Sequence, residues 1–185
     1  MLASGTLKPV GHVCGEGSVR PDGGDAVFQV GDKVVYPKHG AGIIEAIEDR
    51  EVLGERKRYY VLRLPVSDMQ VLVPCDGSER VGLRQVMSEQ MLQRVLEVLR
   101  SRNTQPANKW NHRYRTNLEK IRSGDILALA EVVRTLSQRD REKGLSTAER
   151  KMLENARQIL LSEIVLVRDL EPEQASSFLD HVLAQ

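Results

Sequence analysis

The stretch FQVGDKVVYPKHGAGIIEAIEDREV, residues 28–52, decides the fold of the first half of this chain. It is rich in β-branched residues, and the pairs Gly31-Asp32 and His39-Gly40 are turn signals that divide it into short strands. Two more segments of this kind follow, RYYVLRLP at 58–65 and MQVLVP at 69–74. Four short strands separated by turns over roughly fifty residues predict a small, strongly bent antiparallel β-barrel.

Beyond this barrel the apolar residues take up a helical period, which they keep to the end of the chain. Segments 88–100 and 123–144 each carry one apolar stripe, and Ser146 with Glu149 forms a capping box that opens a further helix. Pro172 is well suited to begin the last helix. The stripe residues are Met91, Leu92, Val95, Leu96 and Leu99 in the first segment and Ile126, Leu129, Val132, Val133 and Leu136 in the second.

These patterns predict an α+β fold, with an N-terminal antiparallel β-barrel followed by a C-terminal all-α helical domain. We expect the barrel domain to span residues 27–78, a linker 79–87 and the helical domain 88–185. Residues 1–26 are rich in glycine and lack both strand and helix periods, so we expect a disordered leader there.

The composition excludes several classes of protein. Lysine and arginine total 27 against 26 acids, so the net charge of +1 does not by itself indicate a nucleic-acid or membrane partner. The apolar runs are too short to span a bilayer and the N-terminus is a poor signal peptide, which predicts a cytoplasmic protein. Cys14 and Cys75 match no metal-binding spacing, so we expect no metal and no cofactor. The motifs GxSxG, HExxH and GxxxxGK[ST] are absent, which argues against an enzyme.

One segment of the helical half is strongly basic. Between residues 100 and 122 there are seven lysines and arginines against one acid, and Trp110, the only tryptophan in the chain, lies among them. Such a local patch is typical of proteins that contact backbone phosphates, although a solvated helix face has the same composition. Tyr114, Leu118 and Ile121 form the apolar stripe of this helix, and Trp110 is in phase with them. Periodicity therefore leaves two interpretations of Trp110 open, a core residue or a side chain that projects with the cations.

The segments FQVGDKVVYPKHGAGIIEAIE, VGLRQV, NKWNHRYRTNLEKIRSGD and GLSTAERKMLENARQIL occur in this order, and together they resemble the CarD family of bacterial transcription regulators, also called CdnL. A barrel of roughly fifty residues is similar to SH3-like and Tudor-like folds. The family resemblance implies that this barrel is a Tudor-like domain that binds the β subunit of RNA polymerase. It further implies that the helical domain contacts promoter DNA at the upstream edge of the melting bubble. The implied result is a stabilised open promoter complex, with no reaction catalysed.

The resemblance also implies roles for particular residues of the barrel. Arg50 matches an arginine used against the polymerase β subunit, and Val52 lies beside it. Leu72 stands where relatives carry a second polymerase-contacting arginine. This departure makes the strength and geometry of the polymerase contact a point to test.

In the helical domain the resemblance implies a DNA-binding set of seven residues. Trp110 matches the family tryptophan that wedges into the minor groove, and Arg113 and Arg115 match residues near the phosphate backbone. Arg150 and Lys151 fall at a second basic position, and His112 stands where another cation is expected. The complete set is Lys109, Trp110, His112, Arg113, Arg115, Arg150 and Lys151.

The expected partners are therefore the polymerase β subunit and promoter DNA, contacted through the minor groove and backbone without reading sequence. We expect no membrane partner, a monomer, and association with the nucleoid through the polymerase. A second interpretation is an RNA-binding or ribosome-associated adaptor that uses the barrel as its nucleic-acid module. That alternative requires exposed aromatic side chains on the sheet, and Tyr59 and Tyr60 are the adjacent pair available.

Overall fold

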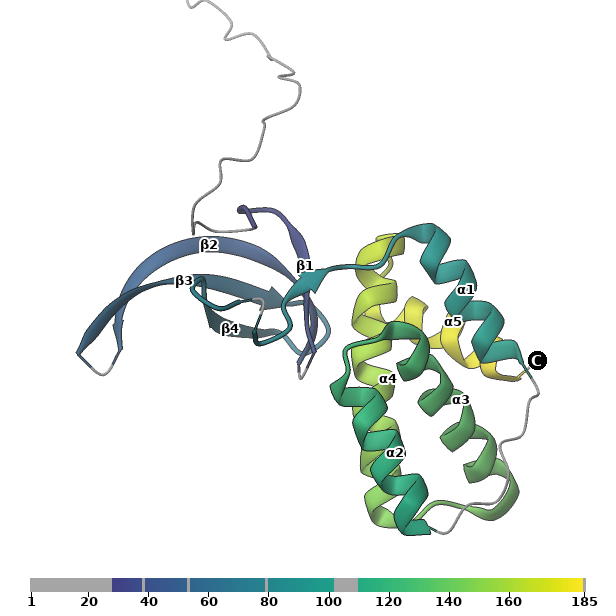
Figure 1. Cartoon of the computed structure of the whole chain (residues 1–185). Helices are drawn as coiled ribbons and strands as arrows, with labels where there is room; N and C mark the ends of the chain where they lie inside the picture. The colour runs from purple at the N-terminus through teal and green to yellow at the C-terminus, as the bar shows by residue number, and fades with distance from the viewer. Residues whose placement is uncertain (1–27, 38, 53, 79, 102–109, 185) are drawn as a thin grey trace, which may run out of the picture.

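The computed structural model describes residues 28–37, 39–52, 54–78, 80–101 and 110–184. The leader predicted for residues 1–26 and the predicted DNA contact Lys109 lie outside these described residues. Figure 1 shows a curved antiparallel sheet beside a bundle of helices, with the long helix α4 (Thr147–Arg168) between the sheet and the rest of the bundle. The α+β fold class is thus confirmed.

The sheet is built from strands β1 (Lys33–Tyr36), β2 (Gly40–Val52), β3 (Glu55–Leu64), β4 (Met69–Pro74) and β5 (Arg84–Gln85). Their order across the sheet is β4-β3-β2-β1-β5, and all neighbours are antiparallel. The register of β2 against β3 shifts between Ile44 and Ala46, which leaves Glu45 as an extra residue. Such a bulge increases local twist and bends the strand, in keeping with the curvature of β2 in Figure 1.

One face of the sheet closes over a small apolar core. Tyr60 is fully buried in this core, and its hydroxyl oxygen accepts a hydrogen bond from the Phe28 backbone N–H at 3.3 Å. The ring of Phe28 meets that of Tyr60 edge to face, with 6.1 Å between the centroids. The buried members of the cluster are Phe28, Val34, Ile44, Tyr60, Leu62, Val73 and Leu83.

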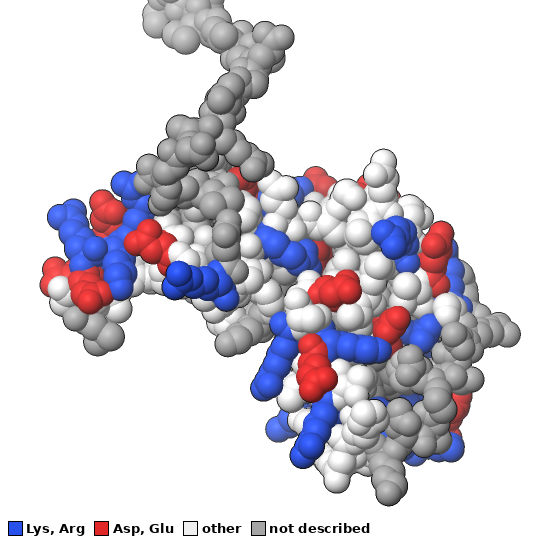
Figure 2. Space-filling model, viewed as in Figure 1, with Lys and Arg blue, Asp and Glu red and all other residues white. Residues whose placement is uncertain are grey.

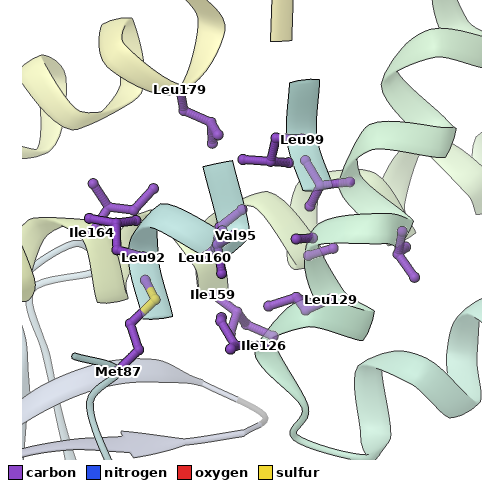
Figure 3. Close-up of a cluster of buried hydrophobic side chains, with 14 of the residues drawn as sticks. Met87, Leu92, Val95, Leu99, Ile126, Leu129, Ile159, Leu160, Ile164 and Leu179 are labelled. Atoms are coloured by element: carbon purple, nitrogen blue, oxygen red, sulfur yellow. The ribbon is translucent and has the colours of Figure 1, made fainter. Parts of the chain in front are cut away.

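The bundle consists of α1 (Glu89–Arg100), α2 (Trp110–Arg122), α3 (Ile126–Lys143), α4 and α5 (Pro172–Ala184). The predicted stripes of the first two helical segments point inward: all their members are buried except Met91, which is partly buried. Figure 3 shows side chains from α1, α3, α4 and α5 directed toward one another in this core. The capping box of Ser146 and Glu149 is confirmed, and α5 begins at Pro172 as predicted.

The sheet and the bundle share apolar contacts. Val35 of β1 and Ala41 of β2 belong to the same buried cluster as the helices. Gly40 begins β2 with φ of 99°, and a Cβ atom there would lie 2.6 Å from the Ser162 hydroxyl oxygen of α4. A residue with a side chain would therefore be strained by its backbone and would collide with α4.

The segment 79–87, predicted to be a linker, contains β5, which pairs with β1 through Val34 and Val35. Met87 at the end of this segment is buried in the core of the bundle. Part of the predicted linker is therefore an integral strand of the sheet.

Candidate polymerase-binding face and nucleic-acid interface

The three residues predicted to bind polymerase lie on one face of the sheet. In antiparallel sheets, directly opposed residues point to the same side and successive residues alternate. Val52 is opposed to Glu55 and Arg50 to Lys57 across β2 and β3, while Leu72 is opposed to Val61 across β3 and β4. The partners on β3, Glu55, Lys57 and Val61, are separated by even numbers of residues and therefore point to the same side. Arg50, Val52 and Leu72 thus share one face of the sheet, which is the face opposite to Tyr60.

This outer face combines exposed apolar and charged side chains. Val52 and Leu72 are 42% and 40% exposed. Arg50 is exposed as well, and its guanidinium forms a 2.7 Å salt bridge with Glu48 of the same strand. In Figure 2, basic and acidic side chains are mixed over the far end of the sheet, where Figure 1 places the β2–β3 hairpin. A partner with apolar groups and charges of both signs fits such a surface better than a uniformly charged polymer.

Trp110 is the first residue of α2 and is 45% exposed, so the core interpretation of this residue is wrong. Its ring stacks on that of Tyr114 with 5.4 Å between centroids and an interplanar angle of 22°. Tyr114, Leu118 and Ile121 continue inward along the predicted stripe. Helical phase brings Trp110 onto this stripe, but its place in the first turn lets the indole extend beyond the bundle, with Tyr114 supporting one of its faces.

The first turns of α2 and α4 lie at the end of the bundle that is far from the sheet (Figure 1). His112 and Arg115 on α2 are exposed there, as are Arg150 and Lys151 on α4. Arg115 has no ion-pair partner within the described residues. Arg150 has a long ion pair, with 3.9 Å between its Nη2 atom and Asp140 Oδ1. In Figure 2, basic side chains stand along the lower edge of the bundle, where Figure 1 places α2.

Arg113 differs from the other cations of this set because it is held inside the protein. Its Nη2 and Nε atoms donate to Glu149 Oε1 at 2.8 Å and 3.2 Å, and its side chain is 17% exposed. Glu149 is itself buried and also accepts hydrogen bonds from the hydroxyl and the backbone N–H of Ser146. Arg113 therefore ties the start of α2 to the start of α4, and Arg115 is the better placed of the two for a phosphate.

Opposing effects act on the Glu149 carboxyl. Burial raises its pKa, but the hydrogen bonds from Arg113 and Ser146 outweigh burial and hold the pKa below the usual range of a glutamate. The carboxylate is thus charged at neutral pH, and it forms an ion pair with the Arg113 guanidinium.

The RNA-binding alternative requires exposed aromatic side chains on the sheet, and Tyr59 and Tyr60 do not meet this requirement. Tyr60 is fully buried, and Tyr59 is 9% exposed. Neither ring can serve as a platform on which an unstacked base could lie. Among the described residues, several large hydrophobic side chains are exposed, and Trp110 is the one of them that is aromatic.

The structure thus offers two candidate surfaces: the outer face of a small curved sheet, and the end of the bundle where Trp110 is exposed among cations. A family model described as the CarD-like/TRCF RID domain matches residues 28–87, and one described as the C-terminal domain of CarD matches residues 94–180. The chain belongs to the CarD family and is a transcription factor of that family. It is 40% identical to "Putative transcription factor YdeB" of Bacillus subtilis (strain 168) over 152 residues, which cover 82% of this chain and 99% of that protein.

Two other kinds of site, metal-binding clusters of side chains and membrane-spanning helices, are both absent from the described part of the chain. No three side chains of histidine, cysteine, aspartate or glutamate gather there in a way that could hold a metal ion. None of the described helices is long and apolar enough to cross a membrane.

Sequence reasoning did not find the acidic partners of this architecture. Glu149 was recognised only as a helix cap, and Glu163, which is fully buried in α4, was not singled out. Glu163 lies within the apolar run ILLSEIVLV, and an acid inside such a run is the signal that could have identified it.

Proposed function

We propose that this transcription factor binds the RNA polymerase β subunit through the outer face of its sheet and promoter DNA through the far end of its bundle. The DNA contact is at the upstream edge of the melting bubble, and binding there stabilises the open promoter complex. The observation that carries the proposal is Trp110, which is exposed, stacked on Tyr114 and placed at the first turn of α2. A rigid, half-exposed indole supported from behind is the kind of group that inserts at an unstacked base step.

The cations around Trp110 have a different task from the ring. Arg115, Arg150 and Lys151 are exposed and can approach phosphates, which fixes the register of the protein on DNA without reading its sequence. Because these cations are few, the isolated protein should bind DNA weakly, with a log–log salt slope of only about 0.9 for each phosphate contact. Promoter specificity would then come from the polymerase.

The sheet supplies the second attachment. Arg50, Val52 and Leu72 share the outer face, where Val52 lies two residues from Arg50 on β2 and Leu72 lies on β4, on the other side of β3. Attachment of this face to polymerase converts the weak DNA contact into an intramolecular one, whose occupancy is set by an effective concentration rather than by free protein.

The test is the lifetime of open complexes formed with Trp110→Ala. Stacking on a base is worth about 1–3 kcal/mol, which corresponds to roughly five- to hundred-fold in a rate that opposes melting. We therefore expect a competitor challenge of preformed complexes to show faster decay by a factor in that range, with β-subunit binding unchanged. Trp110→Phe keeps a ring on Tyr114 and should give an intermediate lifetime.

Met69→Ala is the matched control, because Met69 is a 50% exposed hydrophobic residue on β4 that is opposed to Leu64 and so lies on the other face of the sheet from Leu72. It should leave the lifetime unchanged. Equal lifetimes for the wild type and a folded Trp110→Ala variant would contradict the proposal.

A further inference from the structure

The strand β5 contributes an arginine whose guanidinium enters the bundle. Arg84 Nη2 lies 2.6 Å from Glu163 Oε1 and Arg84 Nη1 lies 3.1 Å from Glu163 Oε2, so the pair is bidentate. The Glu163 side chain is fully buried, whereas 31% of the Arg84 side chain is exposed. Glu163 also accepts a hydrogen bond from the Met87 backbone N–H at 3.3 Å. The carboxylate of one helix thus holds both β5 and the chain that leaves it.

The same guanidinium reaches a second part of the bundle. Arg84 Nε donates to the Gly124 carbonyl oxygen at 3.2 Å. Gly124 lies in the turn between α2, which ends at Arg122, and α3, which begins at Ile126. A single side chain of the sheet therefore contacts α4 and the turn that ends the helix carrying Trp110.

Other contacts hold the sheet against α4 but do not reach α2. Lys33 Nζ donates to the Leu166 carbonyl oxygen at 2.7 Å. The Ala41 backbone N–H donates to the Ser162 hydroxyl oxygen, also at 2.7 Å. These bonds fix where the sheet touches α4, whereas the planar fork of Arg84 restricts how the sheet is rotated relative to α2 and α4.

We propose that Arg84 is a positioning residue that fixes the orientation of the sheet relative to α2, and so fixes where Trp110 lies when the sheet is attached to polymerase. This inference rests on the proposed function above. A buried ion pair is a poor source of stability, because desolvation offsets much of the attraction, but its geometry is specific. A fixed orientation keeps the effective concentration of Trp110 at the bubble edge high, whereas rotational freedom would dilute it.

Two variants test the residue. Arg84→Met combined with Glu163→Gln removes both charges, so no unpaired carboxylate remains in the core. Arg84→Lys keeps a charge beside Glu163, but one ammonium cannot reproduce the bidentate geometry together with the bond to Gly124. If the double variant fails to fold, Arg84→Lys keeps the proposal open to refutation.

The matched control is Arg157→Met combined with Asp180→Asn. Arg157 and Asp180 form a 2.8 Å salt bridge between α4 and α5, and the Arg157 side chain is 29% exposed, close to the value for Arg84. This pair lies within the bundle and should not influence the orientation of the sheet.

The first measurement is independent of transcription. Spin labels at Asp76→Cys on the sheet side and Lys143→Cys at the end of α3 report the distance between the two parts, in a chain whose Cys14 and Cys75 are replaced by serine. We expect one narrow distance distribution for the otherwise unchanged protein and for the control. Both Arg84 variants should give a broadened or displaced distribution, and an unchanged one would overturn the proposal.

The second measurement uses the full chain with polymerase and promoter DNA. Both Arg84 variants should bind the isolated β subunit and free DNA within about twofold of the wild type, while open-complex lifetime falls roughly three- to tenfold as the accessible volume of Trp110 grows. The control variant should behave as the wild type does.

The outcomes separate the two proposals. An altered distance with an unchanged lifetime, in an assay where Trp110→Ala does shorten it, would overturn the role of Arg84 and leave the proposed function intact. An altered distance with no effect of either Arg84 or Trp110 on lifetime would refute the proposed function, and this inference would fall with it.

Discussion

Replacing Arg113 with alanine removes the only described arginine that lies within 3 Å of the buried Glu149 carboxylate. The carboxylate loses two hydrogen bonds and keeps those from Ser146, while Arg139 stays at 3.7 Å. Breaking a buried ion pair by removing one partner costs about 3–5 kcal/mol. Because Ser146 remains and the pair is at the rim of the core, we expect a loss of about 2–3 kcal/mol in the free energy of unfolding.

Urea unfolding followed by helical circular dichroism measures this loss, and Arg115→Ala is the matched control two residues along the same helix. Arg115 is exposed and has no ion-pair partner within the described residues, so its replacement should change stability by less than about 0.5 kcal/mol. In a DNA titration against salt, Arg115→Ala should instead lower the log–log slope by about 0.9 if it contacts one phosphate.

A double-mutant cycle with Glu149→Ala isolates the pair itself. Removing both partners should cost less than the sum of the single losses, because the single Arg113 variant includes the penalty of an unpaired carboxylate. Equal stabilities for Arg113→Ala and Arg115→Ala would refute the structural role of Arg113. Arg113 would then be a candidate DNA-binding residue, as Arg115 is.

Three further predictions concern other parts of the molecule. Folding lowers the pKa of Glu149, so its ionised form stabilises the folded state at pH values above the ordinary glutamate pKa of about 4.3. This stabilisation should be lost as the pH falls through the lowered pKa, and unfolding curves at acid pH measure the loss. Arg50→Glu should weaken β-subunit binding in a pull-down, whereas Arg56→Glu, on the opposite face of the same hairpin, should not. Gly40→Ala should lower the melting temperature, because its Cβ would meet the Ser162 hydroxyl; an unchanged value would mean that α4 can withdraw at no cost.

Periodicity was sufficient for the elements whose burial follows a simple pattern. The stripes of α1 and α3, the capping box at Ser146 and the start of α5 follow from spacing and local chemistry, so they were predictable. Strand β5 was not, because a strand of two residues is too short to show alternation. Its existence depends on pairing with β1, which is a contact between distant parts of the chain.

The residues of the candidate site could be predicted from the sequence, but which of them are buried in ion pairs and which are exposed could not. Arg113 and Arg115 are two positions apart in one basic segment, and no property of that segment distinguishes them. The difference arises because two steps along a helix rotate the side-chain direction by about 200°, so the two residues point to nearly opposite sides and one meets α4 while the other meets solvent. Trp110 raised the same difficulty, since helical phase allowed burial and only its place in the first turn decided its exposure.

The two buried glutamates give α4 a role that its apolar stripe alone would not have. Glu149 and Glu163 are fourteen positions apart, which is ~21 Å along a helix and within about 40° of the same face. Each captures an arginine from another element, Arg113 of α2 at one end and Arg84 of β5 at the other. Apolar packing tolerates small rotations and shifts, whereas a buried carboxylate is costly unless one particular guanidinium meets it in one geometry. Helix α4 thus holds β5 and α2 at two points, and the spacing of these points is set by the fourteen positions between the two glutamates rather than by apolar packing alone.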